Sequence, residues 1–186
     1  MILRCTRRAL ALLGTRAAIV TNQPPSDDDW YLNLLWLDRR KCLLLAHAGT
    51  LFPVLAADVR AGDLRPLGPF IVTTIQAELA SEGLAADTLG QLDPNTVEVA
   101  KTASRTVLGF MNDMASYLQY AVADAGGLYE CDPRILNHQL RRRLHSRAAM
   151  RRLSNSPRNA SRGPSGDRRG HVVATSRARS LRRRRS

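Results

Sequence analysis

Two apolar runs separated by three residues constrain the fold of this chain more than any other feature. They are Trp30 to Leu37, with the sequence WYLNLLWL, and Lys41 to His47, with the sequence KCLLLAH. Asp38-Arg39-Arg40 joins them, so together they predict an antiparallel hairpin. Both runs carry apolar residues on both faces, which is typical of central strands that are covered on both sides. The sheet that contains this hairpin therefore needs a packing layer on each face.

Helical spacing of apolar residues identifies two helices that could form these layers. Phe70, Ile71, Ile75 and Leu79 predict a helix over 70–82, which Gly83 ends. The same kind of spacing predicts a longer helix over 104–124. Thr102 or Ser104 would cap the start of this second helix, and Gly126-Gly127 would end it.

We therefore predict an α+β fold, in which a mostly antiparallel sheet of four or five strands packs with helices. Pro53 argues that its strand lies at an edge or contains a bulge, since proline cannot donate to a ladder. A short helix between a Thr6 cap and a Gly14 stop is expected near the N-terminus, although the acid-free residues 1–26 also fit a transit peptide. The strands are expected near residues 2–5, 30–37, 41–47, 50–56 and 96–101.

Charge divides the 186-residue chain into two parts near Leu140. Residues 1–140 contain 12 Lys and Arg against 15 Asp and Glu, a net charge of −3, whereas residues 141–186 contain 16 Arg against one acid, a net charge of +15. We predict a globular domain over 1–140 and a basic extension over 141–186. A basic amphipathic helix that starts at Asp132-Pro133 runs into the extension, which continues as a disordered Arg- and Ser-rich tail. A frameshift in a GC-rich gene would produce the same composition. The extension is therefore either a selected nucleic-acid-binding arm or the product of such a frameshift.

The sequence lacks the usual signatures of catalysis and of metal binding. It contains no P-loop, dinucleotide-binding, metalloprotease or hydrolase-elbow motif, so neither a cofactor nor a metal is expected. Its three cysteines, Cys5, Cys42 and Cys131, are widely spaced, which fits free thiols in a reducing, cytoplasmic compartment. A catalytic pair of Cys42 and His47 has no local support. No apolar run approaches the roughly 20 residues of a transmembrane helix.

A polar cluster surrounds the predicted long helix. At its start, Lys101 and Arg105 flank Thr102 and Ser104, and such a helix start suits an anion such as phosphate. The alternative is that Thr102 and Ser104 only cap the helix.

Asn112 and Asp113 interrupt the apolar pattern further along the same helix. Asp113 lies eight residues from Arg105, which is too far for pairing on one helix, so it could instead reach Asn33 or Arg60. Structural hydrogen bonds to neighbouring loops are the alternative role. The candidate ligand-binding residues are Lys101, Thr102, Ser104, Arg105, Asn112, Asp113, Asn33 and Arg60.

Three stretches carry a resemblance to a known family. They are MILRCTRRAL, DWYLNLLWLDRRKCLLLAHAGTLFPVL and AKTASRTVLGFMNDMASYLQY. The chain resembles an uncharacterised, mainly bacterial family of domains of unknown function, the 6933 type, over about residues 1–140. The combination WY-x-NLL-x-x-D with KT-x-SR-x-VLG-x-MND is its specific part. The resemblance implies that residues 1–5 belong to the domain, but it supplies no activity, cofactor or catalytic residue.

These observations favour a small non-catalytic module that binds an unknown protein or small-molecule partner. One alternative is a nucleic-acid-binding accessory protein, in which Arg141–Arg185 contact phosphates without reading sequence. Another is an enzyme of unrecognised class that uses Asp113 and Arg105. Such an enzyme requires a concave pocket that contains both groups.

Overall fold

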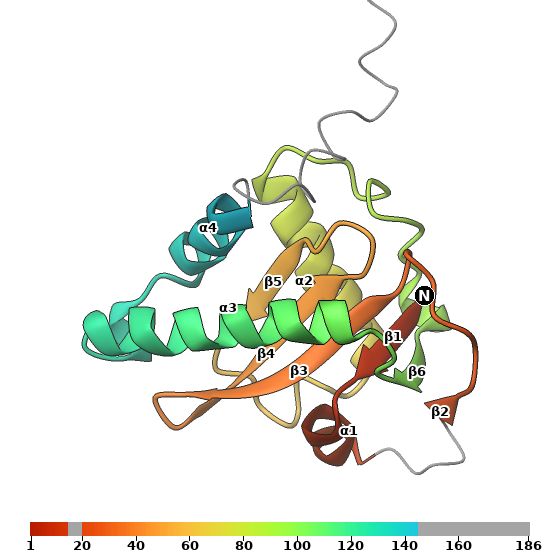
Figure 1. Cartoon of the computed structure of the whole chain (residues 1–186), viewed down its shortest axis with the longest axis horizontal. Helices are drawn as coiled ribbons and strands as arrows, with labels where there is room; N and C mark the ends of the chain where they lie inside the picture. The colour runs from red at the N-terminus through yellow and green to blue at the C-terminus, as the bar shows by residue number, and fades with distance from the viewer. Residues whose placement is uncertain (15–19, 145–186) are drawn as a thin grey trace, which may run out of the picture. The chain divides into compact units, whose positions relative to one another are not determined.

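The computed structural model describes residues 1–14 and 20–144, which form a sheet between two layers of helices (Figure 1). The Arg-rich tail, which the sequence predicts to be disordered, lies outside the described residues. In chain order, the elements are β1 Ile2–Cys5, α1 Arg7–Leu13, β2 Val20–Thr21, β3 Trp30–Leu37, β4 Arg40–His47, β5 Pro53–Ala56, α2 Leu67–Ser81, η2 Pro94–Thr96, β6 Glu98–Lys101, α3 Arg105–Asp124, η3 Leu128–Glu130 and α4 Pro133–Leu144.

The predicted α+β class is confirmed, but the prediction of a mostly antiparallel sheet is wrong. The strand order is β2-β6-β1-β3-β4-β5, with parallel pairing from β2 through β3 and antiparallel pairing from β3 through β5. The sheet is therefore mixed. Its parallel half arises because connections that carry helices return the chain in the same direction, which hairpin turns cannot do.

The central hairpin forms as the sequence predicts, except that Arg40 belongs to β4 and not to the connection. Leu37 pairs with Arg40, so Asp38 and Arg39 form a two-residue turn, with φ values of 46° and 59°. Positive φ at both central residues is the requirement of the turn that matches the twist of antiparallel strands. The expectation of an edge strand at Pro53 is also confirmed, because β5 is the last strand of the sheet.

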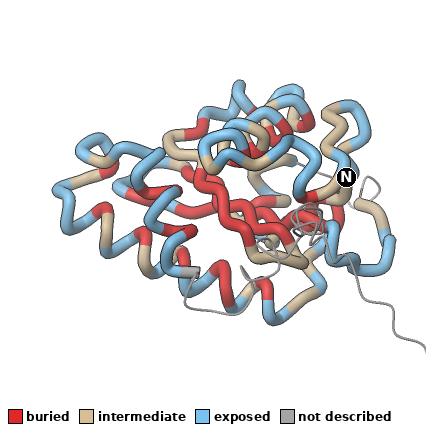
Figure 2. Tube along the Cα trace, turned by 90° about the horizontal axis from the view of Figure 1, so that it is seen from above, coloured by how far each residue is buried: buried red, intermediate tan, exposed pale blue. Residues whose placement is uncertain are grey.

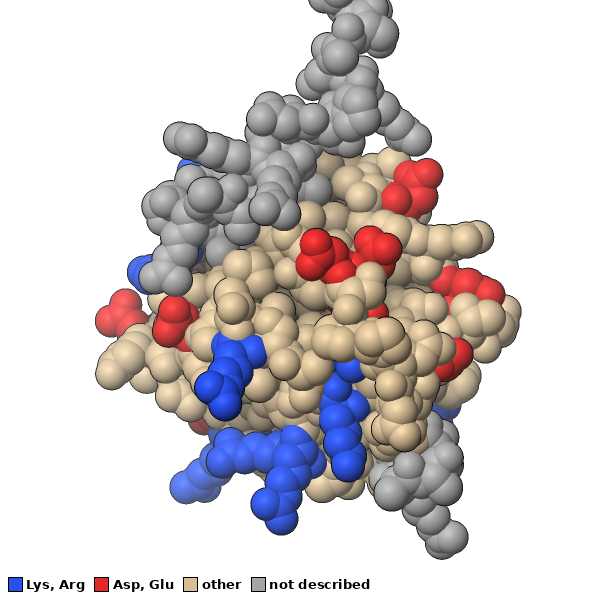
Figure 3. Space-filling model, turned by 45° about the vertical axis from the view of Figure 1, so that its right-hand side comes forward, with Lys and Arg blue, Asp and Glu red and all other residues tan. Residues whose placement is uncertain are grey.

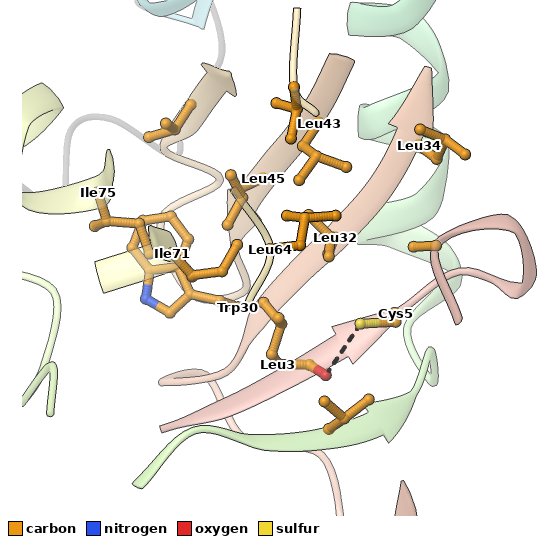
Figure 4. Packing of buried hydrophobic residues seen from close by; sticks show 14 of the residues in the cluster. Leu3, Cys5, Trp30, Leu32, Leu34, Leu43, Leu45, Leu64, Ile71 and Ile75 are labelled. Atoms are coloured by element: carbon orange, nitrogen blue, oxygen red, sulfur yellow. Dashed lines mark hydrogen bonds between the residues drawn. The ribbon is translucent and has the colours of Figure 1, made fainter. Parts of the chain in front are cut away.

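Each face of the sheet has its own apolar core. On one face, α1 and α2 pack against Trp30, Leu32 and Leu45 (Figure 4), and on the other, α3 and α4 pack against Tyr31, Leu44 and Leu55. Figure 2 shows the buried residues concentrated in the central strands and along the inward sides of the helices. The structure therefore confirms the prediction that the central strands are covered on both faces.

Arg4 is a charged residue within this apolar surrounding, and it is 3% exposed. Its Nε donates to Asp29 Oδ2, and its terminal nitrogens donate to the carbonyl oxygens of Gln23, Pro24 and Lys101 at 2.7–3.3 Å. A buried guanidinium is tolerated only when its charge and its N–H groups have partners. Arg4 therefore holds β1, the end of β6 and the loop before β3 together.

α4 attaches to the domain through Asn137, to which the sequence assigned no role, and through Arg141, which the sequence placed among the arginines that contact nucleic acid. Asn137 accepts a hydrogen bond from Leu55 N at 2.7 Å and donates to Leu55 O at 2.9 Å, so its amide pairs with the edge strand β5. Arg141, at the start of the predicted basic extension, is buried and donates to Glu78 and Glu82 at 2.7 Å. Burial alone raises the pKa of Glu82, but hydrogen bonds from His138 and Arg141 bring it below its ordinary value.

Within residues 1–14 and 20–144, no helix combines the length and the apolar composition that crossing a membrane requires.

The amide of Asn137 makes a stability prediction possible. Asn137→Ala leaves the buried N–H and C=O of Leu55 without these partners, so we expect the free energy of unfolding to fall by about 2–3 kcal/mol in urea denaturation. Asn112→Ala is the matched control, because Asn112 is exposed on α3, and its change should stay within about 0.5 kcal/mol. Equal losses in the two variants would contradict a structural role for the Asn137 amide.

Candidate functional site

Strands β1 and β6 lie side by side and end at the same edge of the sheet. Cys5, the last residue of β1, pairs with Lys101, the last residue of β6. From there the chain continues into α1, whose Ala9 belongs to one core, and into α3, whose Val107 belongs to the other. The helices that follow these two neighbouring parallel strands therefore lie on opposite faces of the sheet, so the direction in which the chain leaves the sheet switches at this edge.

The start of α3 is fixed by two hydroxyl groups. Ser104 Oγ accepts from Val107 N at 3.3 Å, so Ser104 is the N-cap that the sequence left open between Thr102 and Ser104. Tyr31 Oη, from the buried side of β3, accepts from Ser104 N at 3.0 Å. Helix geometry gives the N–H groups of Arg105 and Thr106 no intrahelical acceptor, so they point out of the start of the helix.

Four cationic side chains lie at the carboxyl ends of β1 and β6, in the first turn of α1 or next to the start of α3, and we call them the basic edge: Arg7, Arg8, Lys101 and Arg105. All four are exposed, and neither α1 nor α3 has an acidic residue in its first turn. Figure 3 shows blue Lys and Arg side chains gathered at the lower end of this side of the molecule, with red carboxylates nearer the top. Sequence analysis missed Arg7 and Arg8, although their position directly after the Thr6 cap was available as a signal.

Asn33 lies close to the basic edge but is occupied by a neighbour. Its Oδ1 accepts from Thr6 Oγ1 at 3.0 Å, and the same hydroxyl accepts from Ala9 N to cap α1. Arg60 does not belong to this edge. It follows β5, which lies beyond β3 and β4 in the sheet, and its backbone N donates to Asp63 at 2.8 Å.

Asn112 and Asp113 lie two turns further along α3, and both are exposed. Asp113 lines a groove between α3 and α4 that has a volume of about 830 Å³. The structure therefore divides the predicted cluster: Lys101, Thr102, Ser104 and Arg105 surround one end of α3, whereas Asp113 belongs to a different surface.

The structure does not support a Cys42–His47 pair. Both residues are on β4, but Cys42 belongs to the core beneath α3, while His47 contacts Trp30 on the opposite face, with ring centroids 5.3 Å apart. Burial also raises the pKa of Cys42, and it raises the pKa of Cys5 to about 12. Both thiols are thus protonated at neutral pH and are poor nucleophiles. Among the described residues, no group of three His, Cys, Asp or Glu side chains is placed to hold a metal.

Comparison with known proteins gives one match. The family model described as "Domain of unknown function (DUF6933)" matches residues 2–158, which confirms the resemblance indicated by the three sequence stretches. The match extends beyond Leu140 and includes all of α4. No curated protein and no solved structure matches the chain.

His47 gives a pH-dependent prediction. Burial lowers the pKa of His47 in the native protein below 6.5, its ordinary value, which the unfolded chain keeps. Between the native and the unfolded pKa, the unfolded chain binds a proton that the native protein does not. The contribution of His47 to stability is therefore complete above pH 6.5 and is lost as the pH falls through this window.

We expect the free energy of unfolding of the wild type to decrease more than that of His47→Phe between about pH 7 and about pH 5. The phenyl ring keeps the packing against Trp30 but does not titrate. Parallel curves for the two proteins would show that His47 is not buried in its neutral form.

Proposed function

We propose that this chain, which belongs to the DUF6933 family of domains of unknown function, is a non-catalytic module that binds an anionic ligand at its basic edge. The observation that supports this most directly is the switch in connection direction between β1 and β6. In open sheets with parallel strands, ligands bind outside the carboxyl ends of the strands at such a switch.

The charges at the start of α3 favour an anion there. Arg105 is the first residue of the helix, beside the positive end of its dipole, and Lys101 lies just before it. Cations at this end of a helix are unfavourable, typically by about 0.3–1 kcal/mol each. A bound anion would offset this repulsion and accept hydrogen bonds from the Arg105 and Thr106 N–H groups.

The groups at the basic edge are suited to binding and not to proton transfer. They are guanidinium, ammonium, hydroxyl and backbone N–H groups, which hold phosphate or carboxylate oxygens. Asp113, the proposed acid or base of the enzyme alternative, is eight residues along the helix from Arg105, or about 12 Å at 1.5 Å per residue. That alternative remains an untested prediction.

Nucleic-acid binding through Arg141–Arg185 also remains an untested prediction, because most of this segment lies outside the described residues. Of its described members, Arg141 is buried in ion pairs and the guanidinium of Arg143 lies 3.8 Å from the ring centroid of Tyr117. These two arginines are thus already engaged within the domain.

A cytoplasmic location is part of the same proposal, since free thiols such as Cys5 and Cys131 fit a reducing compartment.

Titration with inorganic phosphate, followed by amide NMR, tests the basic edge. We expect saturable shifts at the Arg105 and Thr106 amides, with a dissociation constant of about 1–10 mM, because the site is exposed. Arg105→Gln and Lys101→Gln should each weaken binding by about fivefold, since each removes one cation.

Arg134→Gln is the matched control, because Arg134 is an exposed arginine on α4. It should leave the dissociation constant unchanged. Shifts that occur only in residues 145–186, or a dissociation constant that is unchanged in Arg105→Gln, would disprove anion binding at the basic edge.

A further inference from the structure

The groove between α3 and α4 is a second surface, independent of the basic edge. On α3 its lining residues include Asp113, Tyr117, Tyr120 and Asp124, which recur at helical spacing beside the stripe that faces the core. On α4 they include Ile135, which is 57% exposed. Two stripes of side chains, one from each helix, therefore form the walls of the groove.

The charge of the groove is strongly one-sided. Four carboxylates line it, from Asp113, Asp124, Glu130 and Asp132, whereas Arg143 is the single cationic residue among its lining residues in the described chain. Asp124 is also the last residue of α3, where the negative end of the helix dipole disfavours a carboxylate. The excess of negative charge in the groove thus favours a cationic occupant.

Two tyrosines indicate which cation fits. The guanidinium of Arg143 lies 3.8 Å from the ring centroid of Tyr117, whose hydroxyl donates to Gln139 at 2.7 Å. Tyr120, one turn further along α3, is 77% exposed and presents a second ring in the same groove. A planar guanidinium stacks on such rings better than an ammonium does, so arginine suits this surface better than lysine.

The length of the groove suits a peptide. Asp113 and Asp124 are eleven residues apart on α3, or about 16 Å along its axis, which matches about five residues of extended chain. Ile135 and Leu136 add apolar contact area between the charges. An arginine-bearing segment with small spacer residues would therefore match both the length and the chemistry of the groove.

We propose that this groove binds the arginine-bearing C-terminal segment of a second copy of the chain. Residues 145–186 contain 13 arginines, one acid and no lysine, among Ser, Gly and Ala residues. This composition is complementary to the four carboxylates in charge, and its use of arginine in place of lysine suits stacking on the exposed ring of Tyr120. Because the groove and the segment are different surfaces, the contact is heterologous and adds copies without necessarily closing a ring.

Sedimentation equilibrium of the full-length chain, treated with nuclease, tests this proposal. At low salt the average mass should rise from the monomer value of 20.6 kDa as the protein concentration increases, and high salt should restore the monomer. Tyr120→Ser and Asp124→Asn should each lower the association constant about five- to tenfold, through loss of the stacking ring or of one charge.

Asp28→Asn is the matched control, since Asp28 is an exposed carboxylate in the loop before β3. It should change the association constant less than twofold. A synthetic peptide of residues 145–162 should dissociate the oligomer, whereas the same peptide with citrulline in place of arginine should do so at least about tenfold less well.

Three outcomes would overturn the proposal. A monomer at every concentration would exclude a second copy as the occupant, even if the peptide bound. An effect of Asp28→Asn equal to that of Asp124→Asn would indicate unspecific charge attraction. Equal competition by the arginine and citrulline peptides would show that the guanidinium is not recognised.

Discussion

The buried guanidinium of Arg4 is the interaction on which the arrangement of the parallel strands depends. Arg4 lies on the strand at the middle of the sheet, and its partners come from Asp29, the Gln23-Pro24 loop and Lys101. A charge in this position is costly unless every one of these partners stays in place. The same contacts that satisfy Arg4 therefore hold Lys101 at the end of β6, next to the start of α3.

α3 connects the two surfaces proposed to bind ligands, and its charges are arranged against its own dipole. Arg105 is at its positive end and Asp124 is at its negative end. Sequences usually place the opposite charges there, because that arrangement stabilises the helix. The buried stripe from Val107 to Val122 supplies the packing that maintains the helix despite these ends. Local rules that fail at particular residues of an otherwise regular element are expected at functional surfaces.

The parts predictable from the sequence were those determined by local pattern. The hairpin, the caps at Thr6 and Ser104 and the edge position of Pro53 all follow from a few adjacent residues. Strand order depends on contacts between distant segments, such as β1 with β6, which no local pattern specifies.

The candidate site divides in the same way. The start of α3 was identified because helix caps have a short signature. The groove with α4 was not, because two outward stripes become one surface only after both helices pack on the sheet. Arg141 was grouped with the tail by its charge, yet it is buried against Glu78 and Glu82, which lie about 60 residues earlier.

The contact between Asn137 and Leu55 also determines where the sheet stops growing. An edge strand offers unpaired backbone groups to any other strand, and this is a common route to aggregation. At β5, a side-chain amide takes the place that a seventh strand would occupy, and the helix that carries it blocks approach from that side. α4 thus protects the edge of the sheet from further strand pairing, although it contributes no strand to the sheet.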